Sequence, residues 1–250
     1  MNRTFLIHTD LLLLYCAGIS GQGFHARDIS FRNVAGPAGH QAVALRASAD
    51  LLVFYRCSFE SYQDTLYALS GRQLYRECRI YGTVDFIFGN AIAVFQSCEL
   101  VARLPLPEQT NTVTAQGRKV LADVSGFSFQ NCNIHADDSL GSAVAAGTSS
   151  VHTYLGRPWK AYSRVVFMNS QISSVVDPAG WAPWNSSYPF IDTLYYGEFQ
   201  NYGPGANTSF RVNWPGVHPS LTPEEAAQFS FDNFIAGSTW VSPDEAGFSS

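Results

Sequence analysis

A six-residue pattern of apolar and polar positions recurs along the chain. Five of its six copies open with an aromatic residue, and all six end in a large apolar residue. The copies are residues 26–31, 54–59, 75–80, 95–100, 129–134 and 167–172, and they start 28, 21, 20, 34 and 38 residues apart. A short β-rich unit recurring about every 20 residues predicts an all-β solenoid, a parallel β-helix, because each coil buries its inner face only by stacking on the next.

The fourth position of the pattern should form a column in such a stack. It is occupied in turn by Ile29, Cys57, Cys78, Cys98, Cys132 and Ser170. Adjacent rungs lie about 4.8 Å apart, a spacing that permits a disulfide between Cys78 and Cys98. A column of small buried thiols is the alternative, and we prefer it for Cys57 and Cys132. An antiparallel sandwich is disfavoured, because no Asn-Gly hairpin turn separates the copies.

The pattern ends at residue 172, about two thirds of the way along the chain. We expect one domain over residues 1–250, with an atypical start at 1–17 and a tail at 177–250 that covers an end or a flank of the solenoid. Thr222-Pro-Glu-Glu225 predicts a helix start with a capping box. Residues 11–15 are predicted to form a buried strand rather than part of a signal peptide, and no apolar run reaches the ~18 residues that cross a bilayer.

Composition and charge narrow the classes of function. The chain has 250 residues, is 46% hydrophobic and carries a net charge of −5, so we expect a globular protein that does not bind nucleic acid. No C-x-x-C or Cys/His cluster is present, which argues against a zinc site. Sequons at Asn2, Asn185 and Asn207 are mild support for a secreted glycoprotein.

Two aspartates occupy equivalent places in the repeat. Asp64 follows Cys57 by seven residues, and Asp85 follows Cys78 by seven. Successive coils should therefore present the two carboxylates side by side. Neighbouring carboxylates cannot both ionise easily, so one can act as a general acid and the other as a nucleophile or base. Solvated surface residues or calcium ligands are the alternatives.

Three further polar residues fit this chemistry. Gln41 and Gln63 are amide donors that could stabilise an oxyanion, and Arg157 could pair with an ionised aspartate. A serine nucleophile is not indicated, since the chain has no G-x-S-x-G motif.

Four blocks in order resemble the signature blocks of plant pectin methylesterases (pectinesterases, carbohydrate esterase family 8). The blocks are residues 41–45 (QAVAL), 62–66 (YQDTL), 81–89 (YGTVDFIFG) and 155–159 (LGRPW). The resemblance covers about Gly18 to the C-terminus. It implies a right-handed single-stranded parallel β-helix with a tail of loops and short helices, a secreted cell-wall protein without metal or organic cofactor, and a disulfide between Cys78 and Cys98.

The resemblance also implies a reaction and its residues. The reaction is hydrolysis of the methyl esters of pectin (homogalacturonan) with release of methanol. Asp85 is then the nucleophile, Asp64 the general acid and base, and Gln41 and Gln63 stabilise the oxyanion, while Arg157 holds Asp85. The residues expected to contact the sugar chain are Gln41, Tyr67, Phe88, Arg157, Trp159 and Trp181. We expect a monomer, and a proteinaceous pectinesterase inhibitor is a further candidate partner.

One feature departs from the resemblance. Residues 1–15 do not match the coils that precede Gly18 in the family, so we expect the chain to begin partway into the solenoid, with one coil edge exposed. The missing coils suggest one alternative function, an inactive, truncated relative that only binds pectin. The paired carboxylates suggest another, a pectin-degrading glycoside hydrolase, since a retaining glycosidase also needs two carboxylates roughly 5 Å apart.

Overall fold

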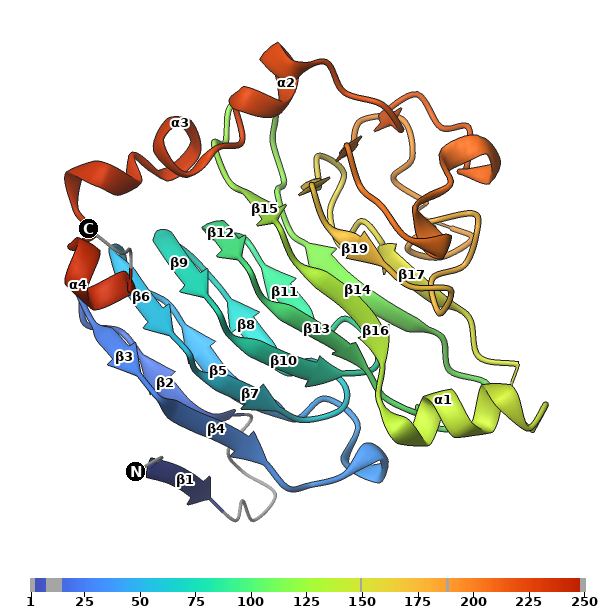
Figure 1. Ribbon diagram of the computed structural model, residues 1–250, viewed down its shortest axis with the longest axis horizontal. Helices are drawn as coiled ribbons and strands as arrows, with labels where there is room; N and C mark the ends of the chain where they lie inside the picture. Colours follow the sequence, from blue (N-terminus) through green and yellow to red (C-terminus); the bar gives the residue numbers. More distant parts are fainter. Residues whose placement is uncertain (1–2, 8–14, 149, 188, 248–250) are drawn as a thin grey trace.

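The computed structural model describes residues 3–7, 15–148, 150–187 and 189–247. Among these residues the chain winds through three parallel sheets in turn, so each full turn adds one strand to each sheet (Figure 1). The predicted right-handed parallel β-helix is confirmed. The predicted strand at residues 11–15 falls largely outside the described residues, as does the sequon at Asn2.

The strands of the three sheets are listed here in spatial order. The first sheet contains β1 (Arg3–Ile7), β4 (Ile29–Asn33), β7 (Ser58–Glu60), β10 (Arg79–Gly82), β13 (Glu99–Ala102), β16 (Asn133–Ala136) and β19 (Gln171–Ile172). The second contains β17 (Thr153–Gly156), β14 (Asn111–Gln116), β11 (Ile87–Gly89), β8 (Leu66–Ala68), β5 (Val43–Ala47) and β2 (Tyr15–Ile19). The third contains β21 (Val217–His218), β20 (Tyr195–Phe199), β18 (Arg164–Met168), β15 (Gly126–Gln130), β12 (Ile92–Gln96), β9 (Arg72–Arg76), β6 (Leu52–Tyr55) and β3 (His25–Arg27).

The aromatic residues that open the repeats form a continuous stack inside the solenoid. Phe54, Tyr75, Phe95, Phe129 and Phe167 pair in register along the third sheet. Successive ring centroids are 4.9, 4.7, 4.5 and 4.4 Å apart, close to the strand spacing. Offset stacking adds to the burial of these large side chains, and this core sets the register of every coil.

The third residue of each repeat makes the bend between the third and first sheets. Its backbone is left-handed in all six copies, namely Asp28, Arg56, Glu77, Ser97, Asn131 and Asn169. This conformation is unfavourable for residues other than glycine, and Asp and Asn tolerate it best. The repeated bend turns the chain sharply enough to close a coil of about 21 residues.

The predicted disulfide between Cys78 and Cys98 is wrong. Both are free, buried thiols, as are the other three cysteines. Both thiols donate to a carbonyl of the preceding coil, Cys78 to Phe54 (3.3 Å) and Cys98 to Tyr75 (3.4 Å). The two side chains thus make the same contact on successive rungs, each thiol facing a backbone carbonyl instead of forming a bond to its neighbour.

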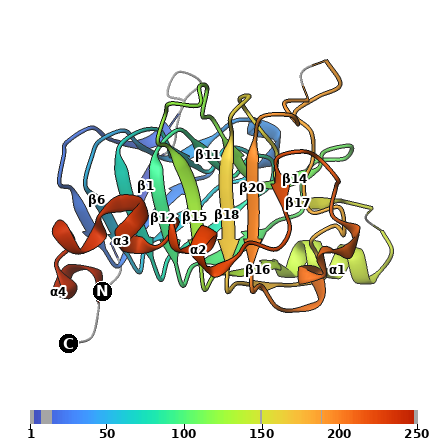
Figure 2. The same ribbon diagram turned by 90° about the horizontal axis from the view of Figure 1, so that it is seen from above.

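Helices and turns lie outside the sheets. The α-helices are α1 (Asp138–Ala145), α2 (Pro223–Ala227), α3 (Phe231–Ile235) and α4 (Pro243–Ala246), and the short 3₁₀ turns are η1 (Pro37–Gly39), η2 (Pro204–Ala206), η3 (Thr208–Phe210) and η4 (Gly237–Thr239). Figure 2 shows α2, α3 and α4 running along the outer face of the third sheet. Ile235 and Val241 pack there on Val53, Leu74 and Val94. No helix of the described residues is long and apolar enough to cross a membrane.

Candidate active site

The structure brings Asp64 and Asp85 together in equivalent turns. Asp64 lies between β7 and β8, Asp85 lies between β10 and β11, and both have left-handed backbones with φ of 62° and 52°. The Asp64 N–H donates to the Val84 carbonyl (3.0 Å), so the two turns are adjacent rungs. The charge of Asp85 consequently acts on Asp64.

Asp85 is held by a bidentate ion pair. It is 6% exposed, and Arg157 donates from Nε to Oδ1 (2.7 Å) and from Nη2 to Oδ2 (2.8 Å). Thr112 donates a third hydrogen bond to Oδ1 (2.6 Å). Burial works against the charge of Arg157, but its bonds to Asp85 and the charges of both aspartates outweigh burial and raise its pKa. This bidentate pairing, together with Thr112, fixes the orientation of the Asp85 carboxylate.

Asp64 is in the opposite electrostatic situation. Burial, and then the negative charge of Asp85, raise its pKa to about 8, although Arg157 opposes the rise. At neutral pH Asp64 therefore keeps its proton. A protonated carboxyl beside an ionised one is the arrangement that separates a general acid from a nucleophile.

Gln41 and Gln63 lie on neighbouring rungs beside this pair. They form a parallel bridge, and the Ala42 N–H donates to the Gln63 carbonyl (3.1 Å). Gln41 is exposed and Gln63 is partly buried. Neither side-chain amide is hydrogen-bonded to another described residue, so both can donate to a bound molecule.

Aromatic side chains extend from the aspartates across the outer face of the second sheet. Tyr67 and Phe88 stack with centroids 4.3 Å apart, and Trp159 meets them edge-on at 6.5 and 6.1 Å. Trp184 packs in the same cluster and lies 4.5 Å from the Arg157 guanidinium. Flat aromatic surfaces next to paired carboxylates are suited to a carbohydrate.

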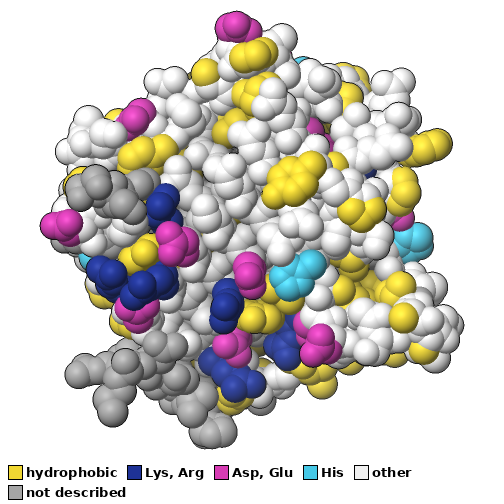
Figure 3. Space-filling model, in the orientation of Figure 1, with side chains coloured by type: hydrophobic (Ala, Val, Ile, Leu, Met, Phe, Trp, Pro, Cys, Tyr) yellow, Lys and Arg dark blue, Asp and Glu magenta, His cyan; other side chains and the backbone are white. Residues whose placement is uncertain are grey.

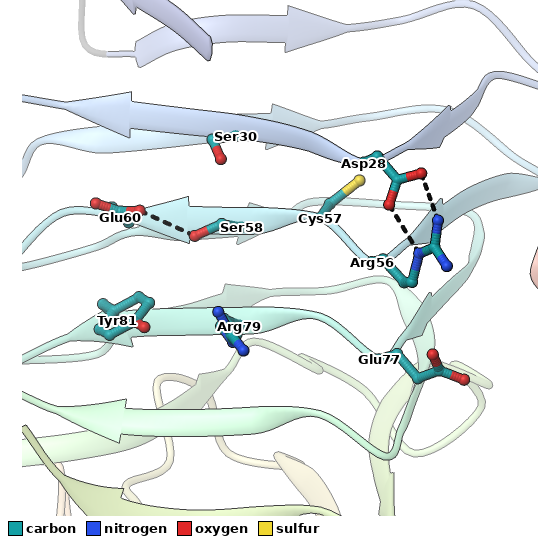
Figure 4. A pocket seen from close by; sticks show the side chains of 9 residues that line it. All are labelled: Asp28, Ser30, Arg56, Cys57, Ser58, Glu60, Glu77, Arg79 and Tyr81. Atoms are coloured by element: carbon teal, nitrogen blue, oxygen red, sulfur yellow. Dashed lines mark hydrogen bonds and ion pairs between the residues drawn. The ribbon is translucent and has the colours of Figure 1, made fainter. Parts of the chain in front are cut away.

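A separate cavity of about 440 Å³ lies on the outer face of the first sheet, and Figure 4 shows its charged lining. Arg56 there binds both Asp28 oxygens (2.7 and 2.6 Å), and Ser58 donates to Glu60 (3.0 Å). Charges of both signs mix over this face (Figure 3). The charged groups of this cavity bind one another, unlike the carboxyl of Asp64, which has no hydrogen-bond or ion-pair partner among the described residues. No group of metal-ligating side chains occurs within the described residues.

Comparison with known proteins agrees with the geometry. The pectinesterase family model matches residues 14–238. The chain belongs to the pectinesterase family. It is 50% identical to probable pectinesterase/pectinesterase inhibitor 44 of Arabidopsis thaliana over 99% of this chain and 46% of that protein. It is 51% identical to pectinesterase 2 of Citrus sinensis over 93% and 44%, respectively.

A solved structure is also similar. Pectin methylesterase from carrot superposes with a TM-score of 0.88 at 47% identity, over 97% of this chain and 74% of that chain. The chain spans about half the length of the curated relatives it matches. The family model and these relatives match nearly the whole of this chain, so the assignment to the pectinesterase family does not depend on a single motif.

Trp181 does not contribute to the site, contrary to the expectation from the family's blocks. It is 1% exposed and stacks on Tyr196 with centroids 4.1 Å apart, so neither ring face is open to a sugar. Trp181 is a core residue that packs the tail onto the solenoid. Trp184, three positions later, is the tryptophan that reaches Arg157.

Sequence reasoning also missed Thr112. This residue lies in β14, on the coil after Asp85, but the insertion around residues 103–110 hides the equivalence of the two positions. The alternation of polar and apolar residues in Thr112-Val113-Thr114 predicts a strand, and this is the sequence signal that could have placed Thr112 next to the Asp85 turn.

Proposed function

We propose that this pectinesterase-family chain hydrolyses the methyl esters of pectin, releasing methanol and leaving free galacturonate carboxylates. The observation that carries the proposal is the electrostatic difference between two adjacent aspartates. Arg157 pairs with Asp85 through two hydrogen bonds, while the pKa of Asp64 is raised to about 8. A nucleophile and a proton donor are thus present together at neutral pH.

In the first half-reaction a carboxylate oxygen of Asp85 attacks the ester carbonyl carbon. The carbonyl oxygen becomes an oxyanion, for which the Gln41 and Gln63 amides are the available donors. The tetrahedral intermediate collapses with cleavage of the bond to the methoxy oxygen. Asp64 gives its proton to that oxygen, so methanol departs and Asp85 is left in an acyl-enzyme anhydride.

In the second half-reaction Asp64 acts as a base. Acylation removes the negative charge of Asp85, which is one of the two causes that raise the pKa of Asp64, so the ionised form of Asp64 is now less disfavoured. Asp64 accepts a proton from water, the hydroxide attacks the acyl carbonyl, and the anhydride opens. The free acid leaves, and both aspartates return to their starting states.

The aromatic cluster supplies the substrate contacts in this proposal. Sugar faces would stack on Tyr67, Phe88 and Trp159, with Trp184 completing the surface beside Arg157. Strand spacing of about 4.8 Å is close to the length of one sugar unit, so a pectin chain laid across the strands meets one rung per unit.

The test is a methanol assay on highly methylated pectin, with reducing ends measured in parallel. We expect methanol without new reducing ends, and loss of methanol release in Asp85→Ala. New reducing ends without methanol would instead identify a glycoside hydrolase. Pectin binding that Asp85→Ala leaves intact, with no methanol from either protein, would identify a pectin-binding relative.

Location and protein partners belong to the same proposal. We infer action on pectin in the plant cell wall, which the plant relatives named pectinesterase support, and Asn185 and Asn207 are exposed as glycosylation sites require. Several relatives are named pectinesterase/pectinesterase inhibitor, so an inhibitor protein is the protein partner to test.

A further inference from the structure

The two oxygens of the Asp85 carboxylate are bound unequally. Oδ1 accepts from Thr112 Oγ1 (2.6 Å) and from Arg157 Nε (2.7 Å), whereas Oδ2 accepts from Arg157 Nη2 alone (2.8 Å) among the described residues. A carboxylate oxygen has two in-plane acceptor sites. Both sites of Oδ1 are therefore filled, and Oδ2 keeps one.

The direction of the Thr112 bonds is fixed by chemistry. The Asp85 N–H can only donate, and it donates to Thr112 Oγ1 (2.8 Å). The hydroxyl proton is then free for the acceptor-only carboxylate. Thr112 Oγ1 thus joins the backbone and the side chain of one residue, and its own side chain is buried.

Thr112 also braces the strained turn that carries Asp85. Asp tolerates the left-handed backbone of Asp85 (φ 52°) better than most residues do, but this conformation still costs free energy that the surroundings must offset. The backbone of Thr112 supplies two more bonds: its N–H donates to Thr83 (3.2 Å), and its carbonyl accepts from Phe86 (3.2 Å). One residue therefore contacts the turn on both sides of Asp85.

We propose that Thr112 is a positioning residue that occupies Oδ1 and so makes Oδ2 of Asp85 the attacking oxygen. The inference rests on the proposed function, since it assigns the atom that forms the new bond to the ester carbon. Without the hydroxyl, Oδ1 regains an open acceptor site, the carboxylate is held by Arg157 alone, and the Asp85 N–H loses its partner. The orientation of the Asp85 carboxylate in which Oδ2 attacks the ester carbon then becomes one of several orientations that it can adopt.

The experiment compares Thr112→Val, which has nearly the shape of threonine, with Thr112→Ser, which keeps the hydroxyl. The matched control is Thr114→Val, because Thr114 is buried in the same strand but its hydroxyl donates to the Leu155 carbonyl (2.9 Å), away from Asp85. Methanol release gives kcat and KM. Hydrogen exchange of the Asp85 amide, read by NMR, reports the backbone bond directly.

For Thr112→Val we expect kcat to fall about 10- to 100-fold, the range for loss of a hydrogen bond to a charged group, with KM changed by less than about threefold. The Asp85 amide should exchange faster. Thr112→Ser should restore both properties, and Thr114→Val should alter neither. Thr112→Ala replaces the valine variant if that variant does not fold.

Three results would overturn the inference: a kcat for Thr112→Val within about twofold of the wild type, unchanged exchange of the Asp85 amide, or a serine variant as slow as the valine. A wild-type protein that releases no methanol would instead defeat the proposed function. Amide exchange would then still test Thr112: faster exchange of the Asp85 amide in Thr112→Val would support Thr112 as the residue that positions Asp85, and unchanged exchange would reject it.

Discussion

Replacing Asp64 by asparagine should stabilise the folded protein while abolishing turnover. Asp64 has a pKa of about 8 in the folded state, against an ordinary value of 3.8. Between these two values the folded chain binds a proton that the unfolded chain has released. The free energy of unfolding therefore falls as pH rises from about 4 to about 8. Asparagine has nearly the same shape and no ionisation, so it removes this dependence.

The size of the effect follows from the difference between the two pKa values. From the ordinary pKa of 3.8 up to pH 7 is about three pH units, over which the unfolded chain has released a proton that the folded chain keeps. Each pH unit changes the free energy of unfolding by about 1.4 kcal/mol. Asp64→Asn should thus be more stable by up to about 4 kcal/mol at pH 7 and by less than about 1 kcal/mol at pH 4. Partial access to solvent makes the upper figure a ceiling.

Urea unfolding at pH 4.5 and pH 7, followed by fluorescence, measures this difference, provided that the slope with urea is the same in both proteins. Asp50→Asn is a control of opposite sign, because its hydrogen bond to Arg72 lowers the pKa of Asp50. That variant should lose stability at pH 7. If Asp64→Asn gains nothing at pH 7, or keeps the pH dependence of the wild type, the account of the raised pKa fails.

Four other outcomes are expected. As pH rises through about 8, kcat/KM for methanol release should fall, because Asp64 loses the proton it donates, and a profile flat to pH 9.5 would contradict this. Arg157→Lys should lower kcat roughly 100-fold, since lysine cannot bind both oxygens of its partner, and an unchanged kcat would show that the bidentate pair is dispensable. Trp181→Ala should destabilise the protein by about 3–5 kcal/mol with little change in KM, whereas a large rise in KM at unchanged stability would return this residue to the substrate site. The urea midpoint should be the same with and without reductant, because Cys78 and Cys98 are free, and a fall on reduction would reveal a disulfide.

Much of the architecture is readable from the repeat. Aromatic residues at equal phase predict a core stack, and Phe54 to Phe167 form one. The capping box at Thr222 is also confirmed. These features depend on residues close in sequence or separated by one coil, where the period alone determines which side chains meet.

The seven-residue offset from the cysteine column likewise brings Asp64 and Asp85 onto adjacent rungs without any tertiary information. What the spacing could not assign is the protonation of each member. The pKa of Asp64 is raised by burial and then by the charge of Asp85, whereas Arg157, which follows β17 two coils beyond Asp85, reaches back to bind both oxygens of Asp85.

Only the tertiary structure decided contacts that cross insertions or the tail. Thr112 contacts Asp85 because the chain, after the insertion around residues 103–110, forms β14 next to β11, the strand that follows Asp85. Trp181 and Trp184 are indistinguishable by composition, yet the path of the tail buries one and turns the other toward Arg157. In the same way, the spacing of Cys78 and Cys98 permits a bond, but each thiol faces a backbone carbonyl. A repeat specifies where a residue lies along the coil, and packing determines where its side chain points.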